Sequence, residues 1–183
     1  MKSKTILGIK KHSFLALIIT FFTLSVLGQK NQAPKIDIHT AVVNGDIKSI
    51  KQHIASKSDL NIKESSGGST PLISAALFGK TEIAKLLIDA GVMLNIQNNE
   101  GSTALITAAF FCRPDIVKML LEKKADKAIK NKYGNTAYTT VTSTFQEVKP
   151  IYDMLGSSLG SLGLKLDYEY LKKTRPVIAS MLK

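Results

Sequence analysis

The apolar residues of the chain follow a helical pattern that itself repeats. Within a unit they recur at three- and four-residue spacing, as Ile83, Leu87 and Ile88 do, which places them on one helix face. Glycines and threonines mark the repeat at a constant spacing of 33 residues: Gly68, Gly101 and Gly134, and Thr70, Thr103 and Thr136. A fixed period of this length is typical of proteins built by stacking one small unit. We therefore predict an all-helical repeat protein.

One unit shows why two helices form and where the first one ends. Thr70 is a helix-capping residue, because its side-chain oxygen accepts a bond from a free backbone N–H. Pro71 suits the first helical turn, where its missing N–H is no loss. Ala75 and Ala76 are small enough for two helices to approach closely, and Gly79 permits the left-handed turn that ends the first helix. A second helix and a polar loop then lead to the next unit.

The two best-formed units resemble the ankyrin repeat, whose pattern runs G-x-T-P-L-H-x-A-A-x-x-G, then an apolar helix, then G-A-D-x-N. They read GSTPLISAALFGKTEIAKLLIDAGVMLNIQNNE from Gly68 to Glu100, and GSTALITAAFFCRPDIVKMLLEKKADKAIKNKY from Gly101 to Tyr133. The resemblance implies an all-α ankyrin-repeat solenoid of about four helix-turn-helix repeats with a helical C-terminal cap. It also implies that the chain binds another protein and is not an enzyme.

Weaker units flank these two, so we place the repeat domain at residues 36–155. The first unit carries one extra residue in its loop at 65–67, which lengthens its offset from the next unit. In the fourth unit Phe145 stands at the place of the turn glycine, and we expect the second helix to end at Leu155. Terminal units of a solenoid are atypical because one side faces solvent.

The last segment, 156–183, is interpreted as a C-terminal cap. It opens with Gly156 and further small residues, which predict a flexible break. Beyond the break the pattern favours one or two short helices that restart at Pro176. The alternative is a partly disordered tail, since chain ends are often loosely held.

The N-terminal stretch, residues 1–28, has the composition of a secretory signal peptide. It begins with four lysines and no acid, continues with an almost wholly apolar run at 14–27, and leaves that run through Gly28. Cleavage there makes Gln29 the first mature residue and leaves a short linker at 29–35. The alternative is an uncleaved anchor, but the run falls short of the roughly 20 residues that a spanning helix needs. We therefore expect export, to the periplasm of a bacterial envelope or beyond it.

The chain is basic, with a formal charge of +11 from 25 Lys and Arg against 14 Asp and Glu. Removal of residues 1–28 takes away four lysines, so the mature charge is 21 − 14 = +7. The remaining lysines are scattered, and aromatic residues do not interleave with them as a nucleic-acid platform requires. We expect no nucleic-acid partner. A cationic binder of anionic envelope surfaces stays open as an alternative.

Cys112 is the single cysteine, so the sequence offers no internal disulfide. It stands at the place of the turn glycine in the third unit. One interpretation is a redox-active thiol whose pKa the neighbouring Arg113 lowers. The other is a small, half-buried filler of the core.

The remaining candidates for chemistry are weak. His39 occupies the motif's histidine place, where a structural hydrogen bond is usual, and His53 lies at a place that is usually apolar. Two histidines without an acid at ligand spacing make a poor metal site, so we expect no metal and no cofactor. The chain also lacks the sequence motifs of hydrolases, metalloproteases and nucleotide-binding proteins.

The resemblance also implies where a partner binds: the loop tips and the exposed places late in each first helix. Of these residues, Leu77, Phe78, Phe110 and Phe111 form an apolar patch if they are exposed, and the alternative is that some of them turn inward. The full predicted set is Ser66, Ser69, Leu77, Phe78, Asn99, Glu100, Ser102, Phe110, Phe111, Lys132, Tyr133 and Asn135. We expect a monomeric module that protects or inhibits a neighbouring exported protein.

Overall fold

The computed structural model of the protein describes residues 34–183, so the predicted signal peptide and residues 29–33 of the linker lie outside the described part. Within it, all regular structure is helical and no strand occurs. The helices are α2 (Ile38–Asn44), α3 (Ile47–Ala55), α4 (Pro71–Phe78), α5 (Thr81–Asp89), α6 (Ala104–Phe110), α7 (Pro114–Glu122), α8 (Ala137–Thr142), α9 (Phe145–Leu159), a short 3-10 turn (Gly160–Leu162) and α10 (Tyr168–Leu182). No helix among residues 34–183 combines the length and apolar character needed to cross a bilayer.

The first helices of three units begin as the sequence predicts. The hydroxyls of Thr70, Thr103 and Thr136 accept hydrogen bonds from the backbone N–H three residues on, over 3.3, 3.3 and 3.2 Å. Each bond satisfies a donor that the first turn of a helix would otherwise leave free. Gly79 ends α4 in the left-handed region at φ 65°, where a side chain is strained.

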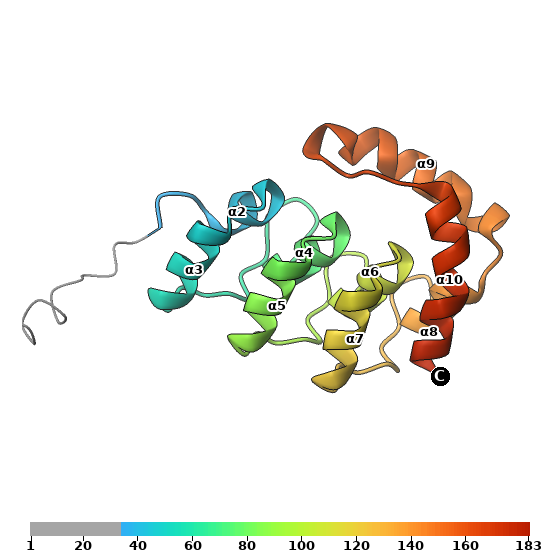
Figure 1. Ribbon diagram of the computed structural model, residues 1–183, viewed down its shortest axis with the longest axis horizontal. Coiled ribbons are helices and arrows are strands. Elements are labelled where there is room, and N and C mark those ends of the chain that lie inside the picture. Colours follow the sequence, from blue (N-terminus) through green and yellow to red (C-terminus); the bar gives the residue numbers. More distant parts are fainter. Residues whose placement is uncertain (1–33) are drawn as a thin grey trace, which may run out of the picture. The chain divides into compact units, whose positions relative to one another are not determined.

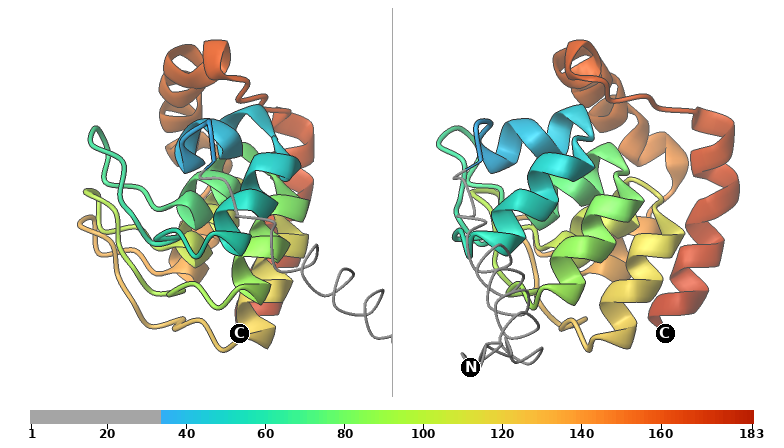
Figure 2. Two further views of the ribbon diagram at one scale, coloured as in Figure 1. Left: turned by 90° about the vertical axis from the view of Figure 1, so that its left-hand side faces the viewer. Right: turned by 60° about the vertical axis from the view of Figure 1, so that its left-hand side comes forward.

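The helices pack as pairs that stand side by side in two rows (Figures 1 and 2). One row consists of α2, α4, α6 and α8, and the other begins with α3, α5 and α7, each helix packing on its neighbours in the row and on its partner. The small residues Ala75, Ala76, Ala108 and Ala109 are buried between the rows, where they let the helices approach closely. The predicted solenoid of helical pairs is confirmed.

Asparagines in the connecting loops hold successive units in register. The side-chain oxygen of Asn61 accepts from the backbone N–H of Met93 over 2.8 Å, and that of Asn95 accepts from Asp126 over 3.0 Å. The next equivalent residue is Ala128, which has no such oxygen. Here Lys127 instead donates through Nζ to the backbone oxygen of Leu182, 3.1 Å away at the end of α10.

The fourth unit differs from the prediction, because its second-helix place is filled by α10. This helix packs on both α7 and α8. Helix α9, which we expected in that place, lies outside both rows (Figure 1). The cause is the connection after α8: Ser143 and Thr144 are both extended, at ψ 150°, so the chain does not make the left-handed turn that reverses it in the second unit. It leaves the stack before a new helix begins.

Two predicted boundaries within the C-terminal segment are also wrong. The expected break at Gly156 is absent, since α9 continues through it to Leu159. The expected restart at Pro176 is absent as well, because Pro176 lies inside the single helix α10. Its ring sits on the exposed side of that helix, which tolerates the one missing N–H. The helical C-terminal cap itself is confirmed, as α10.

Candidate partner-binding groove

A groove of about 770 Å³ lies between the loops, the first helices of the repeats, and α9. The loops form one wall, α4, α6 and α8 form the floor, and α9 forms the other wall. The lining residues of the loops are Ser69, Asn98, Glu100, Ser102, Asn131, Tyr133 and Asn135. Those of the floor and its ends are Ile73, Leu77, Ile106, Thr107, Phe110, Phe111, Thr140 and Ser143. Helix α9 contributes Val148, Ile151, Met154, Leu155 and Leu159.

An aromatic cluster closes the groove where α9 leaves the stack. The ring of Tyr152 stacks on Phe110 with centroids 4.5 Å apart, and Phe111 meets Phe110 edge-on at 5.1 Å. The Tyr152 hydroxyl donates to the backbone oxygen of Phe110 over 2.5 Å. That oxygen belongs to the last residue of α6, where helical carbonyls lack an internal partner. Tyr152 therefore joins α9 to the end of α6 by stacking and by a hydrogen bond.

Arg175 of α10 connects this cluster to the rest of the C-terminal segment. Its guanidinium donates to the Tyr152 hydroxyl over 3.2 Å and to the backbone oxygen of Ser143 over 2.7 Å. The side chain is only 3% exposed, and no ion pair within residues 34–183 includes it. Burial raises the pKa of Tyr152 to about 12, against the opposing charge of Arg175, so the hydroxyl stays protonated and can donate.

The loop wall is built from tips that fold around one side-chain oxygen each. Asn98 accepts from the backbone N–H groups of Glu100 and Ser102, at 3.0 and 2.8 Å. Asn131 makes the same two bonds one unit later, both at 3.0 Å, to Tyr133 and Asn135. The tips are also joined to each other, because the Tyr133 hydroxyl donates to the Glu100 carboxylate over 2.6 Å and its pKa is raised by that bond.

Glu64 performs the same task in the loop that has the extra residue. Its carboxylate accepts from the backbone N–H groups of Ser66, Gly67 and Ser69 at 2.6, 2.6 and 3.1 Å. Desolvation raises the pKa of Glu64, but these bonds and that of the Ser66 hydroxyl outweigh it and lower the pKa to about 2. The longer side chain of Glu spans a loop that is one residue longer.

Eight of the twelve predicted partner-binding residues line the groove: Ser69, Leu77, Glu100, Ser102, Phe110, Phe111, Tyr133 and Asn135. Four do not: Ser66, Phe78, Asn99 and Lys132. The expected exposed apolar patch is not formed, because Phe111 is buried in the core and the other three members are half-buried. The exposed aliphatic residues of the groove lie instead on α9, where Ile151 is 44% exposed and Met154 is 59% exposed.

Sequence reasoning missed α9 as a wall of the site, although one signal was present. Thr144 and Glu147 form a reciprocal capping box, in which each side chain accepts from the other's backbone N–H. Such a pair marks the start of a new helix at Phe145, one residue after Thr144. With Phe145 taken as the turn residue, the following apolar positions are expected in the second helix of the fourth unit, the place that α10 fills.

Cys112 is a core residue with a left-handed backbone. It has φ 53°, is fully buried, and its sulfur lies 3.7 Å from the backbone oxygen of Leu171. Burial raises the pKa of the thiol to about 11, and the charges of Arg175 and Arg113 offset this only in part. Burial thus outweighs Arg113 in setting the thiol pKa, and Cys112 is buried more deeply than the half-buried filler that we expected.

Of the two histidines in the described part, His53 makes the structural hydrogen bonds that we expected of His39. His53 is buried and bonded, with Nε2 2.8 Å from the backbone oxygen of Ile36 and Nδ1 3.2 Å from the Ser58 hydroxyl. Neither ring nitrogen of His39 has a hydrogen-bond partner, contrary to expectation. Residues 34–183 contain no group of three potential ligand side chains that could hold a metal ion.

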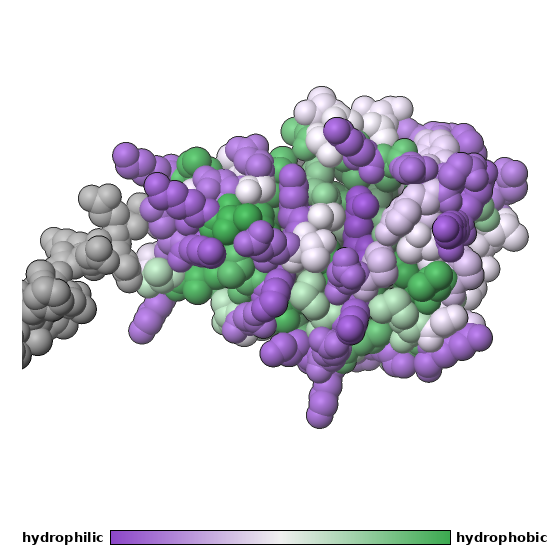
Figure 3. All heavy atoms as spheres, viewed as in Figure 1, coloured by the Kyte–Doolittle hydropathy of each residue, from purple (hydrophilic) through white to green (hydrophobic). Residues whose placement is uncertain are grey.

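Hydrophilic side chains are spread over the face shown in Figure 3 and do not gather into one patch, with apolar side chains visible between them. The groove offers a more specific surface than this scattered one.

Stacked helical pairs with a 33-residue period and a lined groove define a helical-repeat binding protein. The sequence profile of ankyrin repeats, in three copies, matches residues 38–131, and the chain belongs to the ankyrin-repeat family. Ankyrin repeats are modules of protein–protein interaction and are generally not enzymatic. The match ends before α8, so α9 and α10 lie outside it.

Two known proteins illustrate the relationship. The chain is 37% identical over 76 residues to the human ankyrin repeat and SAM domain-containing protein 3. The aligned stretch covers 41% of this chain but only 11% of that protein. It also resembles the crystal structure of the ankyrin repeat domain of Bcl-3, described as a unique member of the IkappaB protein family. That match has a TM-score of 0.55 at 24% identity and covers 63% of this chain and 50% of the other. At this identity the likeness shows the fold alone.

Proposed function

We propose that this protein is an exported binding module that holds a segment of another exported protein in the groove between its repeats and α9. In doing so it protects that protein or inhibits it. The observation that carries the proposal is the groove itself. An apolar floor and an apolar helix wall enclose a volume of about 770 Å³ between them. Grooves that combine apolar surface with a few polar groups are the usual binding sites of proteins.

The distribution of burial supports a binding role for the floor. Leu77 and Phe110 are half-buried at the ends of α4 and α6, so each keeps apolar surface available to a partner. Large side chains at the centre of an interface contribute most of its binding energy, provided that surrounding contacts exclude water. The loops and α9 stand on either side of these residues and supply such surroundings.

The binding role is tested by affinity capture from an extract of the source cells. Leu77→Ser changes a half-buried residue that lines the groove, whereas Phe78→Ser changes its half-buried neighbour, which does not line it. A partner captured by the native chain should be kept by Phe78→Ser and lost by Leu77→Ser, with both variants folded by circular dichroism. Equal capture by both variants would place the interaction elsewhere on the protein.

Export is tested separately by cell fractionation and N-terminal sequencing of the native protein. The composition of residues 1–28 supports cleavage after Gly28, so we expect Gln29 as the first residue of protein recovered from the envelope or the medium. An intact Met1 on protein confined to the cytoplasmic fraction would disprove export, and it would leave the binding role untouched.

A further inference from the structure

We infer that the groove takes an extended, uncharged segment of about five residues, held between the apolar stripe of α9 and the asparagines of the loop wall. The inference rests on the proposed function, because it specifies the kind of segment that the binding module holds. Three features of the groove support it: its charge, the free donors of the loop wall, and the length of the α9 stripe.

The groove is almost free of charge, although the chain as a whole is basic. Glu100 is its one charged lining residue, and no lysine or arginine lines it, although the chain carries 25 Lys and Arg and 14 Asp and Glu. A charged side chain that enters such a groove loses hydration and finds almost no counter-charge. An uncharged segment loses much less, so the groove selects against acidic and basic sequences.

The loop wall offers amide donors that the protein itself does not use. Asn98 and Asn131 line the groove, and their oxygens are occupied by the loop tips, as described above. Within residues 34–183 their Nδ2 groups make no hydrogen bond to the protein, since only the Oδ1 atoms of the two side chains are bonded. A helix has its own carbonyls satisfied internally, whereas an extended segment presents free backbone carbonyls. One free amide from each of two successive units therefore favours an extended segment.

The apolar stripe of α9 sets the length of the segment. Val148, Ile151, Leu155 and Leu159 follow one another at spacings of three, four and four residues, which places them on one face of the helix. At 1.5 Å per residue the stripe is about 16 Å long. Five extended residues span about 17 Å at roughly 3.4 Å each, and their side chains alternate between the two sides of the segment.

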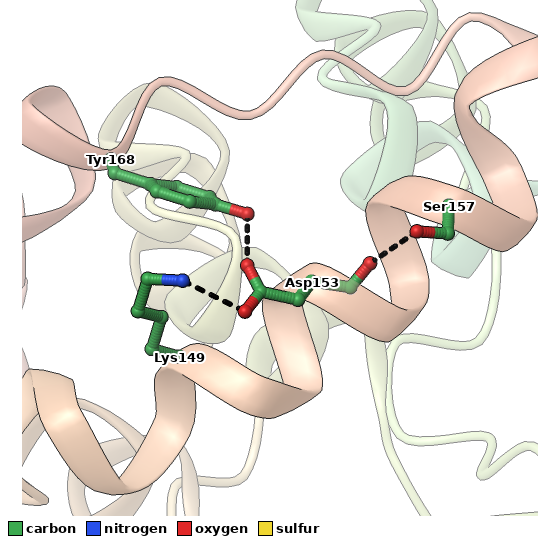
Figure 4. Close-up of polar contacts among 4 residues, drawn as sticks. All are labelled: Lys149, Asp153, Ser157 and Tyr168. Atoms are coloured by element: carbon green, nitrogen blue, oxygen red, sulfur yellow. Dashed lines mark hydrogen bonds and ion pairs between the residues drawn. The ribbon is translucent and has the colours of Figure 1, made fainter.

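Contacts outside the stripe fix α9 in place, so that it acts as a wall. Asp153 accepts from the Tyr168 hydroxyl over 2.5 Å and pairs with Lys149 over 2.8 Å (Figure 4). Tyr168 belongs to the first turn of α10, so this contact ties α9 to the helix that closes the solenoid. Together with Tyr152 it holds α9 at two adjacent positions and leaves Ile151 and Met154 exposed at the groove.

The test is a selection from a displayed library of random 12-residue peptides on the immobilised full chain. We expect the enriched peptides to share an uncharged stretch of about five residues with large apolar side chains at alternate positions. Met154→Ser should weaken their binding about tenfold. Met93→Ser is the matched control, because Met93 is equally exposed, at 57% against 59%, but does not line the groove.

The asparagines are tested by exchange for aspartate. Asn98→Asp and Asn131→Asp keep the oxygen that folds each loop tip, a task that the carboxylate of Glu64 already performs, but they remove the amide donor. Binding of the selected peptides should fall about tenfold in each. Asn99→Asp adds the same charge at the adjacent residue, outside the groove, and should leave the affinity within twofold.

Several results would overturn the inference: no enriched peptide, enriched peptides that are charged or bind as helices, or a hydrophobic small molecule retained in the groove on native mass spectrometry. Equal effects of Met154→Ser and Met93→Ser, or of Asn98→Asp and Asn99→Asp, would also overturn it. The proposed function would survive each of these if the captured protein partner still depended on Leu77. Loss of that dependence would instead remove the proposed function.

Discussion

At the scale of single residues, two positions depart from the repeat pattern yet keep its local geometry. Cys112 adopts φ 53° where the second unit has Gly79 at φ 65°. A side chain is strained in this region, and the burial of the sulfur among apolar residues offsets the strain. Glu64 replaces the asparagine of later units and reaches across a longer loop. In both cases a different side chain preserves the backbone path.

The loop-tip bonds of Glu64 predict a pH-dependent contribution to stability. Glu64→Ala should lower the free energy of unfolding at pH 7 by about 1 kcal/mol, reduced by partial exposure, because several backbone donors lose their acceptor. The folded pKa is lowered from 4.5 to about 2, so this stability is present above pH 4.5 and is lost as the pH falls toward 2. Urea denaturation of both proteins between pH 7 and pH 2.5 measures it.

Glu64→Gln is the control for that prediction, since it keeps one oxygen acceptor and removes the titrating group. The difference in free energy of unfolding between Glu64→Gln and the native protein should likewise shrink as the pH falls. A difference between Glu64→Ala and the native protein that stays constant from pH 7 to pH 2.5 would show that the carboxylate charge contributes nothing.

At the scale of helices, the C-terminal segment is held together by one buried cation. The guanidinium of Arg175 in α10 reaches two oxygens from different elements, the hydroxyl of Tyr152 in α9 and the backbone oxygen of Ser143 at the end of α8. An arginine can contact both at once because its donors are arranged in a rigid fork. The position of α9 beside the groove therefore depends on α10.

Arg175→Lys should be nearly as destabilising as Arg175→Ala, although it keeps the positive charge. The ammonium group of lysine does not reproduce the forked pair of bonds, and a buried oxygen without a donor costs about 1–3 kcal/mol. We expect a loss of about 2 kcal/mol in the free energy of unfolding, measured by urea denaturation. Lys173→Ala, an exposed change in the same helix, should cost less than about 0.5 kcal/mol. If Arg175→Lys is as mild as this control, the forked contact does not stabilise the fold.

At the scale of the whole described part, stability should vary along the stack. Each unit packs only on its neighbours, so a defect in the last unit need not open the first. Helix α10 covers α7 and α8 and buries Leu171, Ile178 and Leu182. It thus closes the end of the solenoid, which would otherwise expose the apolar sides of the third and fourth units.

Ile178→Ala in α10 should therefore lower the free energy of unfolding by about 2–4 kcal/mol, because the native side chain is fully buried and its truncation leaves a cavity. Hydrogen exchange followed by mass spectrometry should show faster exchange in α8 and α10, with α2 to α5 still protected. Val177→Ala, at the adjacent residue that is 54% exposed, should change neither quantity appreciably. Uniformly faster exchange along all units would show that the stack opens as one cooperative block.

The sequence by itself determined the repeat, the helix starts at Thr70, Thr103 and Thr136, and the pairing of helices within the first three units. These features depend on contacts within a unit or between consecutive units, so a period of 33 residues encodes them directly. It also predicted eight residues that line the groove, because loop tips and helix ends occupy fixed places in each unit. The predicted signal peptide remains a prediction from composition.

Only the tertiary structure decided how the chain ends. Helices α9 and α10 both carry apolar residues at helical spacing, so the sequence pattern does not reveal which of them packs on α7. The choice depends on the extended connection at Ser143 and Thr144, on the stacking of Tyr152 against Phe110, and on the burial of Arg175. These are contacts between residues far apart in the chain. They place α9 beside the repeats and so create the groove, whereas the capping box at Thr144 predicts only where α9 begins.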